Sequence, residues 1–202
     1  NKLHTAHARV FLEHGKHVIC EKPLAAHADE VRALQALAAE RGLVYLEAIM
    51  FMHLPQRRLL EAALEKIGPD TMAKIDFCQR SSKYDAYLAG NLPNIFNPAL
   101  ETGALMDLGV YCVYPALHLF GEPENKQITA RLLDSGADGS GIVAMQYPDK
   151  LVTLVYSKIG QAGANTDFQG DRGTVSVESI SRLANIEIVY NDGTREKVCG
   201  EE

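Results

Sequence analysis

Apolar residues in the first part of the chain alternate between two kinds of spacing. They recur every three or four positions before Gly15 and again over residues 28–41, which predicts two amphipathic helices. Each of these segments is followed by a short apolar run, 17–20 and then 43–46, that is typical of a buried strand. Helix, strand, helix and strand joined by short connections predict the back half of a doubly wound parallel sheet.

The two predicted helices have recognisable ends. Asparagine is a favoured cap, so we expect Asn1 to cap the first helix, and glycines follow both helices at their carboxyl ends. The apolar sides are expected to hold Leu3, Ala6, Val10 and Phe11 in the first helix and Val31, Leu34, Leu37 and Ala38 in the second.

After residue 48 the pattern becomes rich in strands. One helix is expected over 55–67, and a longer one over 103–120 is apolar almost all round, which predicts burial. A loop is expected over 84–100, and Asn191-Asp192-Gly193 predicts a hairpin turn. The predicted strands are 71–80, 128–133, 142–147, 152–157, 167–169, 174–178, 186–190 and 195–198. These elements indicate a mixed or antiparallel open-faced sheet with the long helix on one face.

Composition narrows the class of protein. The chain has 202 residues, 47% of them hydrophobic, which suffices for one or two packed domains. Its net charge of −6 argues against nucleic acid or an anionic membrane surface as a partner. No stretch comes near the ~20 apolar residues of a membrane span, and no signal peptide is expected. The isolated cysteines, with no paired spacing, suggest reduced thiols in a cytoplasmic protein.

The first candidate for chemistry is Lys22. It stands between Glu21 and Pro23, directly after the predicted strand 17–20. Ligands collect at the carboxyl ends of strands in α/β folds, and a lysine held there is a candidate proton donor because its surroundings can lower its pKa. A solvated glutamate–lysine pair at the end of a strand is the alternative for these residues alone.

The second candidate is a polar stripe on the long helix. Asp107, Tyr111, Tyr114 and His118 are spaced so that all four fall on one side. An acid on a buried helix must be paired or protonated, so Asp107 needs a partner. Pro115 lacks the amide that would bond the carbonyl of Tyr111 and is expected to kink the helix. The alternative is a structural polar seam, and for Tyr114 and His118 packing is the expected role.

Four stretches together resemble one family of oxidoreductases. They are the N-x-x-H of residues 1–4 with GKHVICEKPL at 15–24, the Glu47-Ala48 pair with its apolar run to Pro55, GALMDLGVY at 103–111, and FQGDRG at 168–173. In this order they resemble the Gfo/Idh/MocA family, and Tyr111 within DLGVYC resembles its dimeric dihydrodiol dehydrogenase-like branch.

The resemblance implies an NAD- or NADP-dependent dehydrogenase. Residues 1–48 would be part of a Rossmann-like dinucleotide-binding domain, and residues 49–202 a substrate-binding and dimerisation domain of α+β class. A hydride would pass between nicotinamide and a small polyol, sugar-derived or dihydrodiol alcohol and its carbonyl form. The implied catalytic residues are Lys22, Asp107 and Tyr111, and the implied cofactor-binding residues are Asn1, His4, Glu21 and Lys22. A homodimer through the open sheet face is expected.

The catalytic trio also makes chemical sense. Lys22 would handle the proton, either directly or by lowering the pKa of Tyr111. Tyr111 could hydrogen-bond the same substrate oxygen, and Asp107 could orient Lys22 or a substrate hydroxyl. The histidine pairs His4-x-x-His7 and His14-x-x-His17 have no converging third ligand, so no metal site is expected.

The chain departs from the family pattern in four ways. The Gly-rich nucleotide turn has no counterpart, and the glycines of residues 136–141 are expected in a hairpin loop. From the resemblance we expect the sequence to begin roughly 70 residues later than the family pattern, about two βαβ units. Met52 stands where relatives often have arginine, and Thr102 replaces a common glycine. We therefore expect this chain alone to bind NAD(P) poorly and to be inactive; the alternative function is an inactive family fragment that dimerises or binds sugars.

Overall fold

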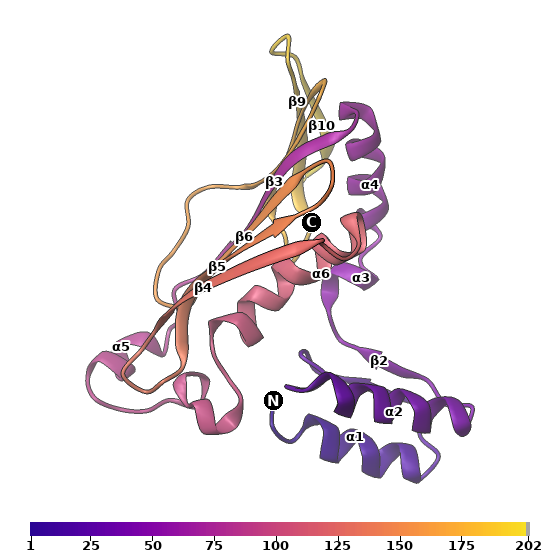
Figure 1. Ribbon diagram of the computed structural model, residues 1–202, viewed down its shortest axis with the longest axis vertical. Coiled ribbons are helices and arrows are strands. Elements are labelled where there is room, and N and C mark those ends of the chain that lie inside the picture. The colour runs from indigo at the N-terminus through magenta and orange to yellow at the C-terminus, as the bar shows by residue number, and fades with distance from the viewer. Residues whose placement is uncertain (201–202) are drawn as a thin grey trace.

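The structure is a computed structural model that describes residues 1–200. Residues 1–48 form a small layer of two helices and two strands, and the rest of the chain builds a long sheet with helices on one face (Figure 1). The small layer lies beside one end of the sheet, below α6 in this view.

The N-terminal layer has the predicted order of elements. It consists of α1 (His4–Glu13), β1 (Val18–Cys20), α2 (Ala28–Glu40) and β2 (Tyr45–Glu47). The two strands are parallel, with Val18 opposite Tyr45. Their helices pack through Ala8 and Leu12 of α1 and Leu34 and Ala38 of α2. The expected Rossmann-like arrangement is confirmed, within a residue or two at each element end.

The start of the first helix was predicted wrongly. The helix begins at His4, and no side chain caps it. The side-chain amide of Asn1 instead donates to the backbone oxygen of Glu101, 2.5 Å away in the second part of the chain. The expected apolar side is also solvent-exposed, with Phe11 55% accessible, because α2 packs against the neighbouring side that carries Ala8 and Leu12.

The sheet has eight strands in the order β10-β9-β8-β7-β3-β6-β5-β4. Only β3 and β6 pair in parallel, so the expected mixed sheet is confirmed among the described residues. The turn Asn191-Asp192-Gly193 joins β9 to β10 as predicted, with φ of 87° at Gly193. The strands are β3 (Asp70–Cys78), β4 (Asn125–Leu132), β5 (Asp138–Gln146), β6 (Leu151–Ser157), β7 (Thr166–Gly170), β8 (Gly173–Ser179), β9 (Ala184–Tyr190) and β10 (Arg195–Cys199).

The glycine-rich stretch 136–141 is not a loop throughout. Asp138 to Gly141 already belong to β5. A Cβ at Gly141 would lie 2.2 Å from the hydroxyl oxygen of Tyr156 and one at Gly139 would lie 2.9 Å from Leu133. Glycine is needed in this strand because large side chains pack directly over its backbone.

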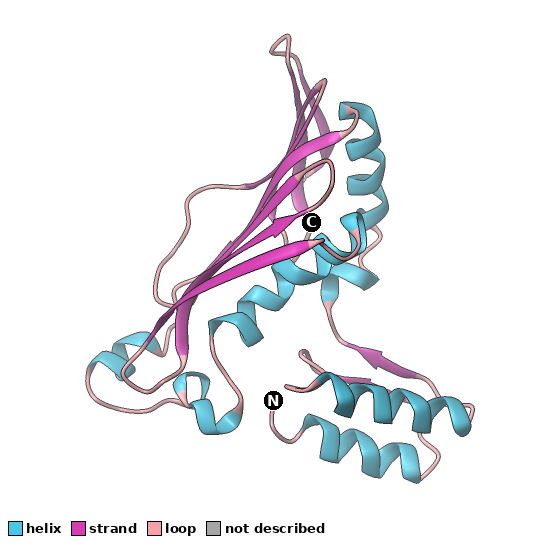
Figure 2. Ribbon diagram, viewed as in Figure 1, coloured by secondary structure: helices cyan, strands magenta, loops and turns pink. Residues whose placement is uncertain are grey.

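The helices lie on one face of the sheet (Figure 2). They are α3 (Met50–His53), α4 (Gln56–Ile67) and α6 (Val110–Phe120), the last continuing from a π turn, η3 (Leu105–Gly109). The segment expected to be a loop contains α5 (Tyr84–Leu88) and two short 3₁₀ turns, η1 (Asn94–Phe96) and η2 (Pro98–Leu100). The core lies between α4, α6 and the sheet, around the fully buried Phe51, Leu60, Ile67, Leu154, Tyr156 and Phe168.

The long apolar segment corrects two expectations. Pro98–Phe120 does have the length and composition of a membrane span, contrary to the expectation that no stretch approaches one. Length and composition are all that this observation rests on. In the fold the stretch begins with a 3₁₀ turn and includes a π turn, and α6 contacts β3 and β6. It is also not buried all round, since Leu117 is 41% exposed.

Candidate active site

Lys22 reaches across from the first part of the chain to the second. It follows β1 by two residues, and its ammonium Nζ lies 2.7 Å from Oδ1 and 2.6 Å from the backbone oxygen of Asp107. The Lys22 side chain is 14% exposed. The end of β1 and the start of the long helix therefore meet at this lysine.

Asp107 has two lysine partners. It lies in the π turn, and its second carboxylate oxygen accepts a hydrogen bond from Nζ of Lys158, the residue that follows β6. Burial raises the pKa of Asp107, but the hydrogen bonds from Lys158 and Lys22 outweigh it and hold the pKa below its usual value. The expected pairing of this acid is present, and the group is a carboxylate at neutral pH.

Tyr111 completes the group. The Lys22 ammonium lies 4.9 Å from the centre of its ring, within the range of a cation–π contact, and the ring meets Phe77 edge-on with centroids 5.3 Å apart. Burial, and then the charges of Asp107 and Glu21, raise the pKa of the Tyr111 hydroxyl. The pKa of Tyr111 is thus raised overall, which does not favour the alternative in which Lys22 lowers it.

Tyr114 has more than a packing role. Its hydroxyl donates to Oε2 of Glu47, the last residue of β2, and Oε1 of the same carboxylate accepts from the amide of Leu24 at 3.2 Å. Burial raises the pKa of Glu47, against smaller lowering effects of the Leu24 amide and the Lys22 charge. This contact ties the N-terminal layer to α6.

His118 packs, as expected, at the far end of the stripe. Its ring meets Phe51 at a centroid distance of 5.8 Å and its Nε2 lies 2.7 Å from Oε1 of Glu61 on α4. The four residues of the predicted stripe thus have partners outside their own helix: Lys22 for the first two, Glu47 for Tyr114, and α3 and α4 for His118.

The remaining predicted residues lie nearby but outside the cluster. His4 Nδ1 is 2.8 Å from the backbone oxygen of Pro23, next to Lys22. Glu21 is exposed and has no hydrogen bond to the described residues, while Asn1 bonds Glu101. The structure therefore brings Lys22, Asp107 and Tyr111 together, places His4 beside them, and shows no hydrogen bond from Asn1 or Glu21 to the described residues of the cluster.

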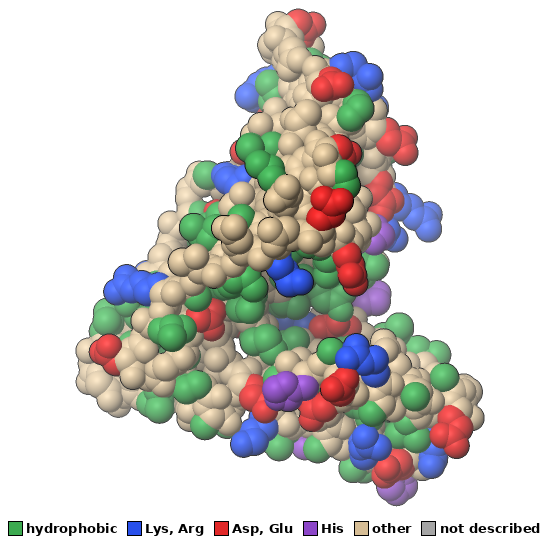
Figure 3. All heavy atoms as spheres, viewed as in Figure 1, with side chains coloured by type: hydrophobic (Ala, Val, Ile, Leu, Met, Phe, Trp, Pro, Cys, Tyr) green, Lys and Arg blue, Asp and Glu red, His purple; other side chains and the backbone are tan. Residues whose placement is uncertain are grey.

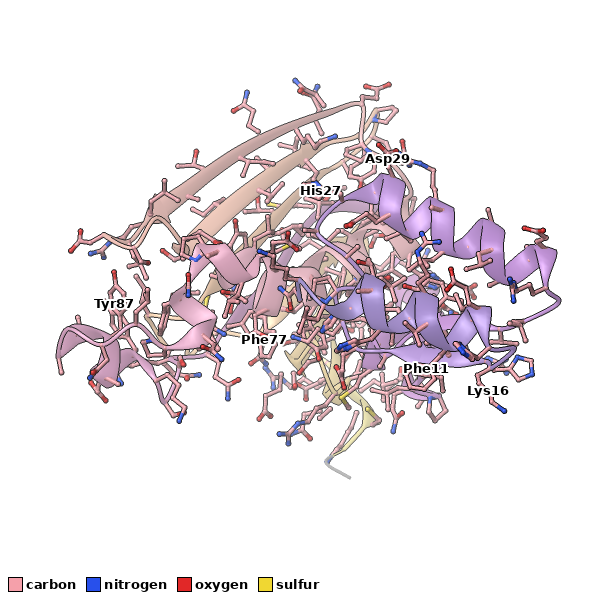
Figure 4. The ribbon with its side chains drawn as sticks, turned by 90° about the horizontal axis from the view of Figure 1, so that it is seen from below. Phe11, Lys16, His27, Asp29, Phe77 and Tyr87 are labelled. Carbon is pink, nitrogen blue, oxygen red and sulfur yellow. The ribbon has the colours of Figure 1, made fainter. Side chains whose placement is uncertain are left out.

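Two hollows in the molecule could admit a small molecule. The space-filling view shows a cleft between the N-terminal layer and the sheet, with hydrophobic and charged side chains along it (Figure 3). Seen from below, Phe77 falls between α5, with Tyr87, and α1, with Phe11 (Figure 4). Phe77 also lines a polar cavity of about 220 Å³, together with Asp76, Gln79, Gln161, Glu178 and Arg182.

Comparison with family models shows to which protein family the chain belongs. The model described as "Oxidoreductase family, NAD-binding Rossmann fold" matches residues 1–48, and the model "GFO/IDH/MocA C-terminal domain" matches residues 58–176. The chain belongs to the Gfo/Idh/MocA family.

Individual Gfo/Idh/MocA relatives cover nearly the whole chain. It is 40% identical over 199 residues to scyllo-inositol 2-dehydrogenase (NADP(+)) IolU of Bacillus subtilis, covering 98% of this chain and 61% of that protein. It is 32% identical over 179 residues to the human trans-1,2-dihydrobenzene-1,2-diol dehydrogenase, covering 86% of this chain and 51% of the relative. The chain thus spans between half and two thirds of these relatives.

A solved structure shares the fold. The crystal structure of KijD10, a 3-ketoreductase from Actinomadura kijaniata, in complex with NADP and TDP-benzene, superposes with a TM-score of 0.81 at 23% identity. The match covers 98% of this chain and 62% of KijD10. At this identity the likeness establishes the architecture.

Lys158 is the site residue that sequence reasoning missed. It is 3% exposed, yet it follows a predicted strand in the same way that Lys22 does. A lysine at the carboxyl end of a strand was the signal that singled out Lys22. Applied to 152–157, the same signal would have found Lys158.

The described residues include groups that could contact the nicotinamide end of a dinucleotide, but no loop of the kind that binds its pyrophosphate. Lys22, Tyr111 and His4 offer a cation, a hydroxyl and an imidazole close to one another. The connections after β1, β2 and β3 that lead into helices, residues 21–27, 48–49 and 79–83, contain no glycine, so the described part of the chain offers no glycine-rich cradle for a pyrophosphate.

Proposed function

We propose that the protein containing this chain is an NAD- or NADP-dependent dehydrogenase. It would act on a small polyol, sugar-derived or dihydrodiol alcohol and the matching carbonyl compound. The observation that supports this most is the buried contact of Lys22 with Asp107 beneath the ring of Tyr111, in a chain of this family. The finer assignments of substrate and residue roles rest on this proposal.

In the proposed reaction Lys22 accepts the proton of the alcohol and returns it in the reverse direction. When an alcohol is oxidised, the carbon loses a hydride and the hydroxyl loses a proton to the neutral amine of Lys22, which leaves a carbonyl. The nicotinamide, when bound, takes up the hydride or supplies it in the reverse direction. Tyr111 would hydrogen-bond the substrate oxygen. Asp107 would hold the Lys22 amine in place through Oδ1 and its backbone oxygen.

The cofactor side is proposed to involve Asn1, His4, Glu21 and Lys22. His4 is the best placed of the additional three, since it contacts the carbonyl oxygen next to Lys22. Asn1 would have to release the oxygen of Glu101 to serve a cofactor.

The proposed substrate is a cyclic alcohol with a neighbouring hydroxyl. This class is common to the names of two relatives, an inositol dehydrogenase and a dihydrobenzene-diol dehydrogenase. The polar cavity beside Phe77 would suit further hydroxyls, because its lining mixes carboxylates, amides and a guanidinium.

We also propose two domains and a homodimer. The domains would be residues 1–48 and 49–202, the last two residues lying outside the described part. The dimer would form through the sheet face without helices, where Met72 is 44% and Leu151 51% exposed on paired positions of β3 and β6. A cytoplasmic location stays a prediction.

The proposed function can be tested on the full-length protein with a panel of substrates. Oxidation of scyllo-inositol, myo-inositol and a trans-dihydrodiol would be followed by cofactor absorbance with NAD and with NADP. We expect turnover with at least one cyclic diol and tight binding of one cofactor. A full-length protein that binds neither cofactor would contradict the proposal and favour the alternative, a non-catalytic dimerisation or sugar-binding module.

A further inference from the structure

Lys22 is held in place from outside its own segment. It follows a strand, β1, that is three residues long and pairs with β2 alone among residues 1–200. The segment 21–27 that carries it contains no helix or strand. A side chain in such a segment keeps one position only where neighbouring groups hold both the side chain and the backbone. Asp107 holds the ammonium of Lys22, and the backbone beside it has a separate partner.

That partner is Glu47, the last residue of β2. Oε1 of its carboxylate accepts from the amide of Leu24, two residues after Lys22, at 3.2 Å, and Oε2 accepts from the hydroxyl of Tyr114 on α6. Glu47 is itself fixed, because its strand is paired with β1 and its backbone oxygen lies 2.8 Å from Nε2 of His53. The carboxylate of Glu47 therefore joins the Lys22 segment to α6.

The Lys22 segment and the long helix are thus joined at two points. Asp107 contacts Lys22 near the start of the helix, and Tyr114 contacts Glu47 seven residues further along. Seven residues make about two turns, so both contacts lie on one side of the helix, about 10 Å apart along its axis. A single contact would leave the helix free to turn about that point, whereas two contacts fix both its distance and its rotation. Tyr111 lies between the two points.

We propose that Tyr114 is a positioning residue that acts through Glu47. It fixes the rotation of the helix against the Lys22 segment, so that the ammonium of Lys22 and the hydroxyl of Tyr111 are directed at the same substrate oxygen. This inference rests on the proposed functions of Lys22 and Tyr111. A displacement of about 1 Å in a reacting group can cost about a hundredfold in rate. A contact that only stabilised the fold would instead change the melting temperature and leave kcat as it is.

The test compares variants of the full-length protein in the oxidation of one cyclic diol. Tyr114→Phe removes only the hydroxyl. It should lower kcat about tenfold or more while KM for the cofactor stays within about twofold, because reacting groups are displaced and no cofactor contact is lost. Glu47→Ala should lower kcat to the same degree, and the double variant should be no slower than either single one, because the two side chains act as a unit. Glu47→Gln keeps an acceptor for the Leu24 amide and a donor for the oxygen of Tyr114, so it should restore most of kcat.

Tyr147→Phe is the matched control. The hydroxyl of Tyr147 donates to the backbone oxygen of Gly121, 3.0 Å away at the far end of α6, so this variant also loses one tyrosine hydrogen bond. Denaturant titration should show a similar loss of stability in Tyr147→Phe and Tyr114→Phe, while only Tyr114→Phe loses kcat. An equal fall in kcat in both variants, or the kcat of the wild type in folded Tyr114→Phe, would overturn the proposal. If Tyr114→Phe does not fold, equal kcat values of Glu47→Gln and Glu47→Ala would overturn it.

Hydrogen exchange keeps this inference apart from the proposed function. The Leu24 amide reports on the Lys22 segment without any turnover, and in the full-length protein it should exchange about tenfold faster or more in Tyr114→Phe than in the wild type. Tyr147→Phe should leave this rate unchanged. If Lys22→Ala stays fully active, the proposed function fails, and an unchanged Leu24 exchange in Tyr114→Phe then overturns the role of Tyr114 as well. If Lys22 proves essential and Tyr114→Phe keeps the kcat of the wild type, only the role of Tyr114 fails.

Discussion

Lys22 and Asp107 are 85 residues apart in the chain and joined at two atoms, since the ammonium of Lys22 bonds both Oδ1 and the backbone oxygen of Asp107. The backbone contact matters because Asp107 sits in a π turn, where the regular helical bonding is widened. A side-chain substitution at Asp107 leaves that carbonyl contact in place. The aspartate can thus be altered without releasing Lys22 altogether.

Removal of the Asp107 charge should change how stability depends on pH. The pKa of Asp107 is lowered in the folded chain, so its contribution to stability is present above the unfolded pKa and is lost as pH falls through the folded one. We expect the difference in melting temperature between the wild type and Asp107→Asn to be constant above about pH 5 and to shrink as pH falls from there to about pH 2. Circular dichroism at several pH values measures this, and a difference that stays constant down to about pH 2 would contradict it.

Glu47 should show the opposite dependence. Burial raises its pKa, so its contribution to stability is present below the unfolded pKa and is lost as pH rises through the folded one. Glu47→Gln keeps an acceptor for the Leu24 amide and should therefore gain in melting temperature relative to the wild type as pH rises from about 4 to 7.

The hydroxyl partner of Glu47 provides the matched comparison. Tyr114→Phe removes the hydrogen bond from the Tyr114 hydroxyl to the Glu47 carboxylate. We expect a loss of about 1 kcal/mol in the free energy of unfolding at neutral pH. Denaturant titration measures it. A variant as stable as the wild type would mean that the contact between the N-terminal layer and α6 does not contribute.

Tyr111 and His118 lie on the same stripe but should differ in their effect on catalysis. Tyr111→Phe keeps the ring over Lys22 and against Phe77 and removes only the hydroxyl. In the full-length protein we expect it to lower kcat by about tenfold or more, since one hydrogen bond to the reacting oxygen is lost. His118→Gln, which changes a packing contact, should leave kcat nearly unchanged. Equal effects of the two variants would argue against the role of Tyr111.

The proposed dimer contact through the open face of the sheet can be tested with a single charged substitution. Met72→Glu places a carboxylate on the proposed dimer surface, and sedimentation at micromolar concentration should then show a monomer. Ile128→Glu is the control. Ile128 is 57% exposed and is paired with the buried Val143, so both side chains lie on the sheet face opposite to that of Met72. A wild-type chain that is already monomeric would rule out this dimer for the chain.

The close approach over Gly141 predicts a local loss of stability. Gly141→Ala would place its Cβ 2.2 Å from the hydroxyl oxygen of the buried Tyr156, and overpacking of this kind costs about 1–3 kcal/mol. Gly163→Ala, with no atom within 4 Å of the new Cβ, is the control for a glycine substitution without a clash. Thermal unfolding of both variants compares them, and equal melting temperatures would refute the argument.

Local signals predicted most of the fold, and tertiary contacts account for the errors. Strand ends and turns followed from apolar runs that end at glycine or proline, which is why Lys22 could be placed at the end of β1. The stretch 136–141 was misread because its glycines serve close packing under Tyr156 and Leu133, which sequence cannot distinguish from a turn. Asn1 was misread for a similar reason, since the partner of its side chain lies 100 residues away.

The sequence predicted those site residues whose positions follow from helix spacing or a strand end, and missed those that depend on contacts between distant segments. Asp107 and Tyr111 fall one turn apart on a helix, so their common side could be predicted. Lys158 lies in a short polar turn after β6, and its burial depends on Asp107 arriving from another element. The contact of Tyr114 with Glu47 likewise depends on how two parts of the chain dock.

The central claim is that Lys22 transfers the proton. Its most direct test is kcat/KM of the full-length protein and its Lys22→Ala variant for oxidation of one cyclic diol, at equal pH and saturating cofactor. General acid–base catalysis contributes about a hundredfold or more, so the variant should fall to about one hundredth of the wild type or below. A folded variant that binds cofactor normally and keeps more than about a tenth of kcat/KM would contradict the account.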